Sequence, residues 1–393
     1  MFKFIQKGFV KELLPLYIST FFHSFYFIGP IAVLFIINKG LSLAEVGLLV
    51  SVVYLVSFLT EYPTGVFADK YGTKKSIFLS YFLFFLYVLI MMFSNNFYGF
   101  LLAYILLGLE MSFSSGASEA LWYDSLKSIN KQKLMKDVTG FLDATGSLGM
   151  MIAAIFGAFL YKYQQNLPFV FTLFFIVVAL ISFYFVKQPK NDSYDELKKI
   201  KLTFNLGFKH LFSKKALIFL FLMGITLFLF EHAWYEMKQP LLVNAGMPIE
   251  FLGILVAIGS IIGIVGGVFL PKLVHILNAK KSILFCILFQ AIGFITIWSN
   301  QKWIMAIGAY SLYISHITWN YVDADLVHKY IPSKIRASTL SARQMIGSLI
   351  YIPNPWLMSW LVQIFATKIF IIFSILIIII NLVVFYFGKK YYK

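Results

Sequence analysis

Long, uninterrupted apolar runs are the feature of this sequence that most restricts its fold. Twelve such runs follow one another, each near the roughly 20 residues that a helix needs to cross about 30 Å of hydrocarbon. The fold class that we expect is therefore all-α, with the helices inside a lipid bilayer. We predict transmembrane helices at 13–37, 43–66, 76–94, 97–124, 138–160, 167–187, 215–238, 248–270, 282–299, 302–325, 338–363 and 367–387.

The composition excludes the main soluble classes. Hydrophobic residues make up 60% of the chain and charged residues only 13%, and the mean hydropathy is +0.82. A soluble domain carries about 25% charged residues and has too little interior to hide this much apolar surface. The net charge of +16 would suggest nucleic acid binding in a soluble protein. Here the basic residues alternate with the spans, so we expect no nucleic acid partner.

Lysine and arginine gather in alternate loops. With the N-terminus inside, 27 of the 33 lie in inner segments and five in outer loops. Positively charged loops stay on the cytoplasmic side, so we expect both termini in the cytoplasm and the protein in a bacterial plasma membrane. The first span has no small-residue cleavage site before it and is expected to stay as an anchor.

Short matches between the two halves indicate an internal repeat. At an offset near 201, the sequence of 146–148 returns at 347–349, and that of 65–67 returns at 267–269. Two six-span halves with the same inside–outside sense are parallel repeats, related by an axis along the membrane normal. We predict an N-terminal half at 1–187, a lysine-rich cytoplasmic linker at 188–214 and a C-terminal half at 215–393.

A charged loop joins the second and third predicted spans. It reads GVFADKYGTKK from Gly65 to Lys75. Gly65 is expected to end the second helix, and Gly72 allows a tight turn at positive φ. Asp69 stands among lysines, so one interpretation is charge at a turn that orients the chain.

This loop resembles the signature loop of the major facilitator superfamily, in which Gly, Asp, Gly and a basic pair follow one another at these spacings. It lies between spans two and three of twelve, as in that family, and the two-repeat layout extends the resemblance over the whole chain. Thr73 stands where the family usually has Arg. The resemblance implies a secondary transporter that works by alternating access as a monomer, without a cofactor.

The resemblance also implies a cytoplasmic gate. In the family, the carboxylate equivalent to Asp69 docks near the start of span eleven and holds the cytoplasmic side shut. That start offers Arg336 here, and a guanidinium and a helix N-terminus both favour a carboxylate. Glu61 and Arg343 lie at similar depth from the cytoplasm, so we expect an ion pair between them. A nearer acid such as Asp325 is the alternative partner of Arg343.

The end of span four carries two more acids that we assign to this gate. Asp124 is expected to pair with Lys74 and Lys75. Glu119 is ambiguous, because on an ideal helix it points away from Glu110, nine residues earlier. Glu119 is therefore expected to bind the signature loop if Glu110 faces the cavity.

Ionisable groups at membrane depth are functional candidates, because a charge there is costly. The resemblance places spans one, four, seven and ten around a central cavity. The candidates for proton coupling or substrate binding are His23, Glu110, Asp143, Glu231, Trp234, Tyr235, His316, Trp319 and Asn320. A carboxyl group held away from water favours its neutral form, so Glu110, Glu231 or Asp143 could carry a proton. Structural interpretations also exist: a hydrogen bond to Ser147 for Asp143, and helix–helix hydrogen bonds for the histidines.

An aromatic cavity with surplus carboxylates suits an organic cation. The sequence contains no phosphate-binding G-x-x-x-x-G-K-[ST] loop and no metal-ligand spacing, so we expect no ATP hydrolysis, metal or cofactor. A membrane enzyme is disfavoured by the repeats. Our leading hypothesis is a proton-coupled exporter of amphipathic or cationic organic compounds. The alternative is a proton-coupled importer of a small metabolite such as a siderophore, nucleoside or peptide, since antiporter signatures in spans four and five are missing.

Overall fold

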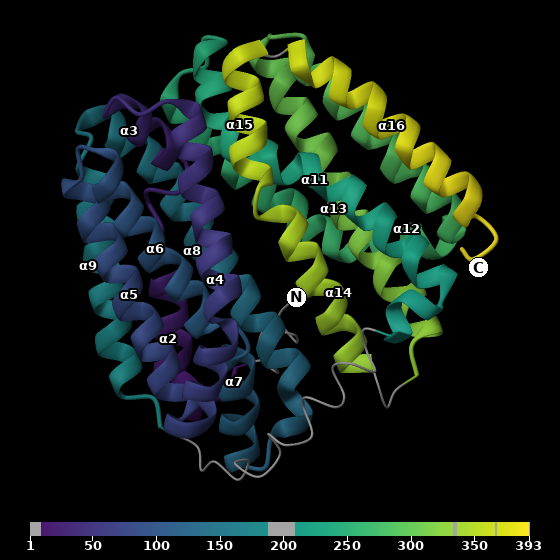
Figure 1. The fold of residues 1–393 in the computed structure, drawn as a ribbon. Coiled ribbons are helices and arrows are strands. Elements are labelled where there is room, and N and C mark those ends of the chain that lie inside the picture. Colours follow the sequence, from purple (N-terminus) through teal and green to yellow (C-terminus); the bar gives the residue numbers. More distant parts are fainter. Residues whose placement is uncertain (1–8, 188–208, 333–335, 366–367, 393) are drawn as a thin grey trace. The chain divides into compact units, whose positions relative to one another are not determined.

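The computed structural model describes residues 9–187, 209–332, 336–365 and 368–392, and the regular elements in these ranges are helices (Figure 1). The all-α class is confirmed. Seven helices of the described chain are long and apolar enough to cross a membrane, judged by length and composition. The count of twelve crossings stays a prediction. Within helices, the side chains that the structure does not describe are those of Phe230, His232, Ala233, Tyr235, Glu236, His328, Arg336, Ala337, Ser338 and Ser341.

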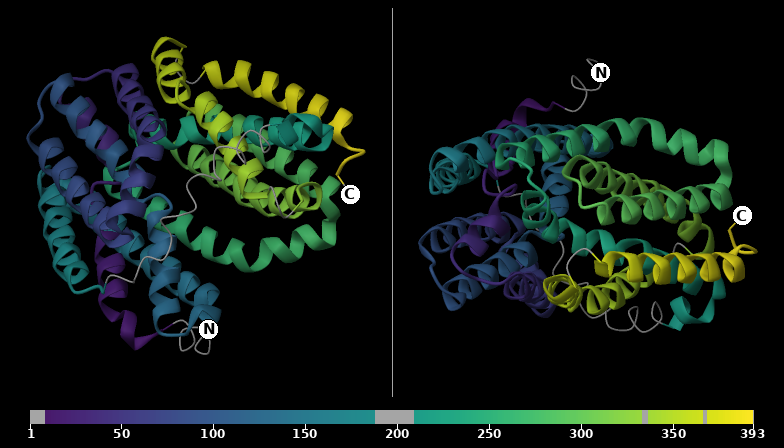
Figure 2. Two further views of the ribbon diagram at one scale, coloured as in Figure 1. Left: turned by 60° about the horizontal axis from the view of Figure 1, so that its bottom comes forward. Right: turned by 90° about the horizontal axis from the view of Figure 1, so that it is seen from above.

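The chain divides into two compact units. The first comprises Met1–Leu41, Val52–Asp195 and Ile249–Ala257. In it α2 packs against α9, and α5 packs against both α6 and α9. Figure 2 shows the helices from two further sides. Apart from the first residues of α4, its helices are η1 (Lys11–Leu13), α2 (Leu14–His23), α3 (Ala32–Asn38), α4 (Leu43–Tyr71), α5 (Thr73–Phe93), α6 (Phe97–Ser114), α7 (Ala117–Ser128), η2 (Gln132–Leu134), α8 (Met135–Tyr163) and α9 (Leu167–Tyr184).

The second unit comprises Ser42–Ser51, Glu196–Pro248 and Ile258–Lys393. In it α11 packs against α13 and α16 around a buried cluster that includes Trp319. Asn278, with φ 60°, interrupts α12, so this element covers two predicted spans. Its helices are α11 (Lys215–Asn244), most of α12 (Ile249–Trp298), α13 (Lys302–Tyr330), α14 (Arg336–Tyr351), α15 (Asn354–Phe365) and α16 (Ile369–Gly388).

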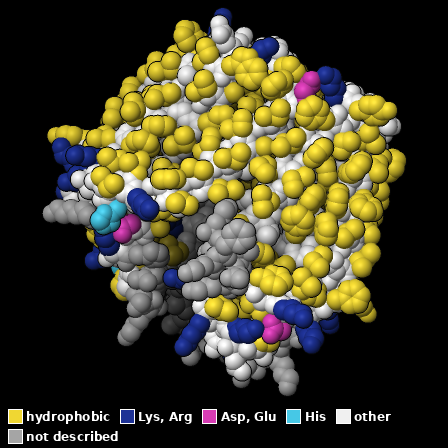
Figure 3. All heavy atoms as spheres, turned by 180° about the vertical axis from the view of Figure 1, so that it is seen from behind, with side chains coloured by type: hydrophobic (Ala, Val, Ile, Leu, Met, Phe, Trp, Pro, Cys, Tyr) yellow, Lys and Arg dark blue, Asp and Glu magenta, His cyan; other side chains and the backbone are white. Residues whose placement is uncertain are grey.

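The surface agrees with a membrane-spanning chain. On the face shown in Figure 3, hydrophobic side chains predominate and charged side chains gather at the margins. Large side chains such as Phe174, Ile295 and Ile372 are each more than 60% exposed. Apolar surface of this extent is stable against lipid and not against water.

The first predicted span is two helices rather than one. Between α2 and α3 the chain leaves helical geometry from Ser24 to Ile31, so the expectation of one continuous helix there is wrong. Pro30 contributes no backbone N–H, and the N–H of Phe27 donates to Thr172 Oγ1 at 3.1 Å. Irregular backbone at membrane depth is tolerated only where protein buries it or where it lines a cavity.

Glycines of α8 let this interrupted segment approach closely. A Cβ at Gly157 would lie 2.0 Å from the carbonyl oxygen of Phe27, and one at Gly149 would lie 2.3 Å from Ser24 Oγ. Both distances are below any real Cβ contact, so these positions need glycine. The segment is therefore held by α8 as well as by α9.

The signature loop differs from expectation at one of its two glycines. Gly72 has φ 97° between α4 and α5, which confirms the tight turn. Gly65 lies inside α4, which continues to Tyr71, so the prediction that Gly65 ends this helix is wrong. Two further spans are interrupted, the fourth at Gly116 (φ 67°) and the eleventh next to Pro353.

Each unit includes the first residues of one helix that continues in the other. In the second unit, a Cβ at Gly47 of α4 would lie 2.5 Å from the carbonyl oxygen of Pro355 in α15. In the first unit, a Cβ at Gly253 of α12 would lie 2.1 Å from the carbonyl oxygen of Ala154 in α8. The predicted halves share these helix starts through backbone contacts that only glycine permits.

Candidate functional site

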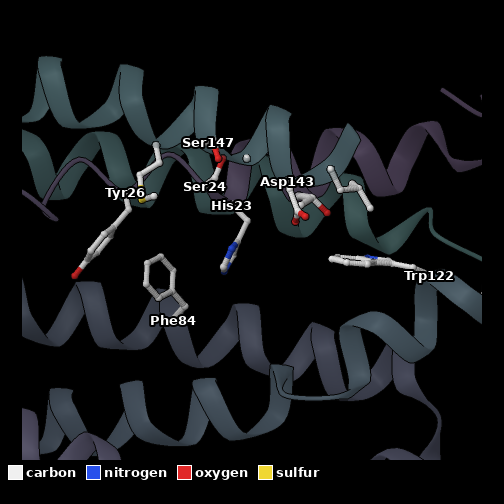
Figure 4. A pocket seen from close by; sticks show the side chains of 11 residues that line it. His23, Ser24, Tyr26, Phe84, Trp122, Asp143 and Ser147 are labelled. Carbon is white, nitrogen blue, oxygen red and sulfur yellow. The ribbon is translucent and has the colours of Figure 1, made fainter. Parts of the chain in front are cut away.

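A cavity of about 560 Å³ lies in the first unit, among α2, α5, α7 and α8 (Figure 4). Most of the groups around it are apolar or aromatic, with a few polar atoms, which is typical of small-molecule sites. The predicted candidates His23 and Asp143 both line it. The lining residues are Thr20, His23, Ser24, Tyr26, Phe84, Trp122, Leu142, Asp143, Gly146, Ser147 and Met150.

The two ends of the cavity differ in character. Figure 4 shows His23 near the middle, with Tyr26 and Phe84 on one side of it and Asp143 and Trp122 on the other. One end is therefore aromatic, and the other pairs a carboxylate with an indole. Because the first span breaks directly after His23, the cavity is lined partly by irregular backbone.

His23 presents a buried polar atom that lacks a partner. Its Nε2 is shielded from solvent and has no hydrogen bond among the described residues. The imidazole stacks on Tyr81, with ring centroids 4.0 Å apart and planes 15° apart. A buried nitrogen without a partner costs about 1–3 kcal/mol, so His23 is a lining residue that carries an unsatisfied polar atom.

Asp143 lines the acidic end of the cavity, and the carboxylate of Glu119 lies near it. Asp143 on α8 is exposed, and the carboxylate of Glu119 on α7 is within electrostatic range of it. Glu119 was expected to bind the signature loop or to face away from Glu110 on an ideal helix. The break at Gly116 separates α6 from α7, so the ideal-helix argument does not apply.

Glu110 is not among the residues that line this cavity. Its side chain is only 8% exposed and accepts a hydrogen bond from Ser80 Oγ at 3.0 Å, between α6 and α5. Tyr81, the neighbour of Ser80, interacts electrostatically with Glu110 and stacks on His23. Glu110 thus lies behind the cavity wall.

In the second unit, two candidates that were proposed separately are in direct contact. Glu231 of α11 and His316 of α13 meet through Oε2 and Nδ1. Both side chains are partly buried, and the ring of Phe228 packs edge-on against the imidazole at 4.3 Å between centroids. The structure therefore assembles a carboxylate–imidazole pair from two helices.

Arg343 has a partner that the sequence analysis did not name. Its guanidinium forms a two-pronged ion pair with Asp323, at 2.6 Å and 2.8 Å. Within the second unit, α13 thus presents an acid to Arg343, while the expected pair with Glu61 stays a prediction. The alternative prediction, that an acid nearer than Glu61 pairs with Arg343, agrees with this contact. The acid named there, Asp325, pairs instead with Lys329 at 2.9 Å.

Asp323 could have been found from its position. It is an ionisable residue at the depth of the other candidates, seven residues after His316 on α13. Seven residues are about two helical turns, so both side chains occupy nearly the same face.

The remaining cavity candidates take different positions. Trp234 and Trp319 are 2% and 0% exposed, and neither indole nitrogen has a hydrogen-bond partner among the described residues. Asn320 is exposed. The side chain of Tyr235 lies outside the described part of the chain. The two tryptophans therefore belong to the packed interior of the second unit.

The gate candidates stay largely as predictions. Lys74 donates to the carbonyl oxygen of Tyr184 at 2.9 Å. The expected contact of Asp69 with Arg336 involves a side chain outside the described residues. The exposed members of this group are Glu61, Gly65, Asp69, Lys75 and Glu119, while Asp124 is half-buried.

Comparison with known proteins places the chain in a family. The model of the Major Facilitator Superfamily matches residues 14–321. The uncharacterized MFS-type transporter YxaM of Bacillus subtilis (strain 168) is 26% identical over 250 residues, which are 60% of this chain and 60% of YxaM. The uncharacterized MFS-type transporter MJ1560 of Methanocaldococcus jannaschii is 23% identical over 259 residues, 64% of this chain and 65% of that protein. The chain thus matches about three fifths of the length of these relatives.

Solved structures share the fold. A mutant of the nucleoside transporter NupG superposes with a TM-score of 0.81 at 13% identity, covering 98% of this chain and 100% of NupG. A POT family transporter bound to a thioalcohol-conjugated peptide gives a TM-score of 0.76 at 13% identity, with coverage of 99% and 100%. The family match, the helical fold and the membrane-length helices agree: this chain belongs to the major facilitator superfamily and is a multi-pass membrane protein.

Proposed function

We propose that the protein exports amphipathic or cationic organic compounds in exchange for protons, and that these compounds bind in the cavity of the first unit. The observation that carries the proposal is the composition of this cavity. Its only charged lining residue is Asp143, Trp122 lies beside it, and aromatic side chains form the other end.

The acidic end suits a positively charged group. Asp143 has the charge of Glu119 nearby, and no lysine or arginine lines the cavity. The indole of Trp122 can add a cation–π contact worth about 0.5–2 kcal/mol. Tyr26 and Phe84 can pack against the apolar part of the same molecule, while His23 Nε2 accepts or donates a hydrogen bond between the two ends.

The membrane potential supports export as the direction. When the cell interior is negative, moving one positive charge into the cell releases about 2.3 kcal/mol of free energy for each 100 mV of membrane potential. Import of a cation therefore needs no further driving force, whereas export must be coupled to another gradient. Titratable groups at membrane depth, namely Glu110, Glu231 and Asp143, are present to bind protons.

The alternative is import of a neutral or zwitterionic metabolite together with protons. The fold neighbours include a nucleoside transporter and peptide transporters, and a siderophore is a further possible substrate. The cavity has no cationic lining residue that would bind a carboxylate, which favours the cationic class.

Transport in proteoliposomes with a pH-sensitive dye inside tests the proposal. The probes are tetraphenylphosphonium, uridine and dialanine. We expect tetraphenylphosphonium and protons to move in opposite directions. Asp143→Asn should lower this exchange about tenfold, because it removes a charge-assisted contact. Asp137→Asn, a change of the same size on the same helix, should leave it within about twofold.

Two outcomes would contradict the proposal. Movement of uridine or dialanine together with protons would establish the importer. If Asp143→Asn transports tetraphenylphosphonium in exchange for protons as fast as wild type, the cavity is not the substrate-binding site.

A further inference from the structure

We propose that Glu231 and His316 together form the proton-binding pair of this transporter, in the second unit, while the substrate cavity is in the first. This inference deepens the proposed function, since it identifies the coupling group. It rests on that function only for the step from proton binding to transport.

The geometry joins the two residues into one titrating group. Glu231 Oε2 and His316 Nδ1 are in direct contact and link α11 to α13. The side chains are 18% and 31% exposed, which shields the pair from bulk solvent and still leaves a path for water. Phe228 covers one edge of the imidazole. A proton bound at this contact lies between an imidazole nitrogen and a carboxylate oxygen.

A second ion pair in the same unit, Asp323–Arg343, differs from Glu231–His316 in how its net charge depends on pH. Asp323 lies on the same face of α13 as His316, and it pairs with Arg343 of α14. Arginine remains charged at every physiological pH, so this pair always has zero net charge. The imidazole changes its charge between about pH 5 and 8. The Glu231–His316 pair therefore has zero net charge with the proton and a net charge of −1 without it.

Two neighbouring side chains that interact with Glu231 are neutral, so they do not offset the charge change that this proton causes. Tyr313 of α13 and Tyr351 of α14 interact electrostatically with Glu231, and Tyr351 also with Arg343. Phenol groups are neutral at physiological pH.

Several other described contacts of α11 are made by uncharged side chains. From α12 and α16, Gln290 and Asn381 bond to each other, and they bond to Thr226 of α11. Asn354 of α15 donates to the carbonyl oxygen of Leu229. Of the fixed charges on these elements, Arg343 pairs with Asp323 and also donates to the carbonyl oxygen of Leu220 in α11. Lys238 lies seven residues after Glu231 on α11, and the side chains of His232 and Glu236 lie outside the described residues.

Loss of the proton has a conformational consequence. It leaves one uncompensated negative charge at membrane depth, which is costly wherever water is excluded. Proton binding therefore favours conformations that close around the pair, and proton release favours those that hydrate it. Among the described residues, the bonded partner of Glu110 is the hydroxyl of Ser80, and Asp143 lines the cavity proposed for the substrate.

Infrared difference spectroscopy tests the pair without any substrate. The protein in lipid is shifted between about pH 8 and pH 5, and wild type is compared with His316→Gln, Glu231→Gln and Asp325→Asn. The imidazole bands removed by His316→Gln are expected to change in Glu231→Gln and to persist in Asp325→Asn. Asp325 is the matched control because it is a carboxylate on the same helix, paired with Lys329 at the surface. Unchanged imidazole bands in Glu231→Gln would overturn the proposal.

Transport then tests coupling, with tetraphenylphosphonium as the probe. Exchange of labelled for unlabelled probe needs no net proton movement, whereas accumulation against a pH gradient does. In Glu231→Gln and His316→Gln, the exchange rate should stay within about twofold of wild type. Proton-driven accumulation should fall about tenfold or more below wild type. Asp325→Asn should keep both.

The outcomes separate the two proposals. If exchange and accumulation fall together in both variants, the pair acts in binding or folding, and its coupling role is overturned. If wild type does not carry tetraphenylphosphonium at all, the proposed substrate class fails, and the infrared result still decides whether the pair binds a proton.

Discussion

Neighbours, more than residue type, determine what an ionisable side chain does in this protein. Glu110 is buried and bonded to Ser80, whereas His23 is a half-buried residue of the cavity lining whose shielded Nε2 has no hydrogen bond among the described residues. A satisfied buried group contributes to stability, and an unsatisfied one lowers it unless a ligand supplies the bond. We therefore assign Glu110 to the packing of α5 against α6, and His23 to the ligand. The sequence predicted both residues as candidates but could not distinguish them, because Ser80 and Tyr81 come from another helix.

The contact between Ser80 and Glu110 gives a prediction at this scale. Ser80→Ala removes the donor and leaves a buried carboxyl group without its partner, so the protein should lose about 1–3 kcal/mol of stability. Glu110→Gln keeps an oxygen that can accept the same bond and should stay near wild type. Thermal unfolding in detergent measures both variants. Equal stability of Ser80→Ala and wild type would show that this bond has no structural role.

At the scale of elements, hydropathy predicts the runs but not their interruptions. Every residue of the first span is compatible with a helix in lipid except Pro30 and its neighbours, and the apolar run continues through them. The break is fixed by distant partners. The N–H of Phe27 bonds to Thr172, 145 residues away, and α8 approaches through Gly149 and Gly157. Such contacts depend on which helices become neighbours, and a single sequence does not contain this information directly.

The close approach of α8 to the interrupted segment can be tested by adding one methyl group. Gly157→Ala would put a Cβ 2.0 Å from the carbonyl oxygen of Phe27, so backbone must move. We expect a loss of about 1–3 kcal/mol and a lower unfolding temperature. Gly146→Ala on the same helix is the control, since nothing lies within 4 Å of its Cβ. A Gly157→Ala variant as stable as Gly146→Ala would contradict the tight contact.

For the whole molecule, the sequence predicted the family and the helical fold, because both depend on the apolar runs, the signature loop and the repeat. It predicted less about which charges meet. Arg343 was assigned to Glu61 from depth alone, and depth does not say which helix is the neighbour. Asp323, which lies on α13 beside His316 in the helical pattern, supplies the partner.

The inside–outside orientation can be tested at the two ends of α8. Gln165 follows the helix and is predicted outside, and Lys133 precedes it and is predicted inside; both are exposed. Cys286 is the single cysteine and is buried, so single cysteine substitutions can be labelled on a nearly silent background. In intact cells, a membrane-impermeant maleimide should label Gln165→Cys and spare Lys133→Cys until the cells are opened. The reverse pattern would invert the topology.

The interruption of the first span has an electrostatic consequence. α2 ends at His23, and Thr20, His23 and Ser24 at this helix end line the cavity. A helix C-terminus carries a partial negative charge of about half an elementary charge, which low-dielectric surroundings screen poorly. The backbone itself thus adds to the negative potential that Asp143 creates in the cavity. For the cationic substrates that we propose, Asp143→Asn should therefore weaken binding without abolishing it, because the contribution of the main chain remains.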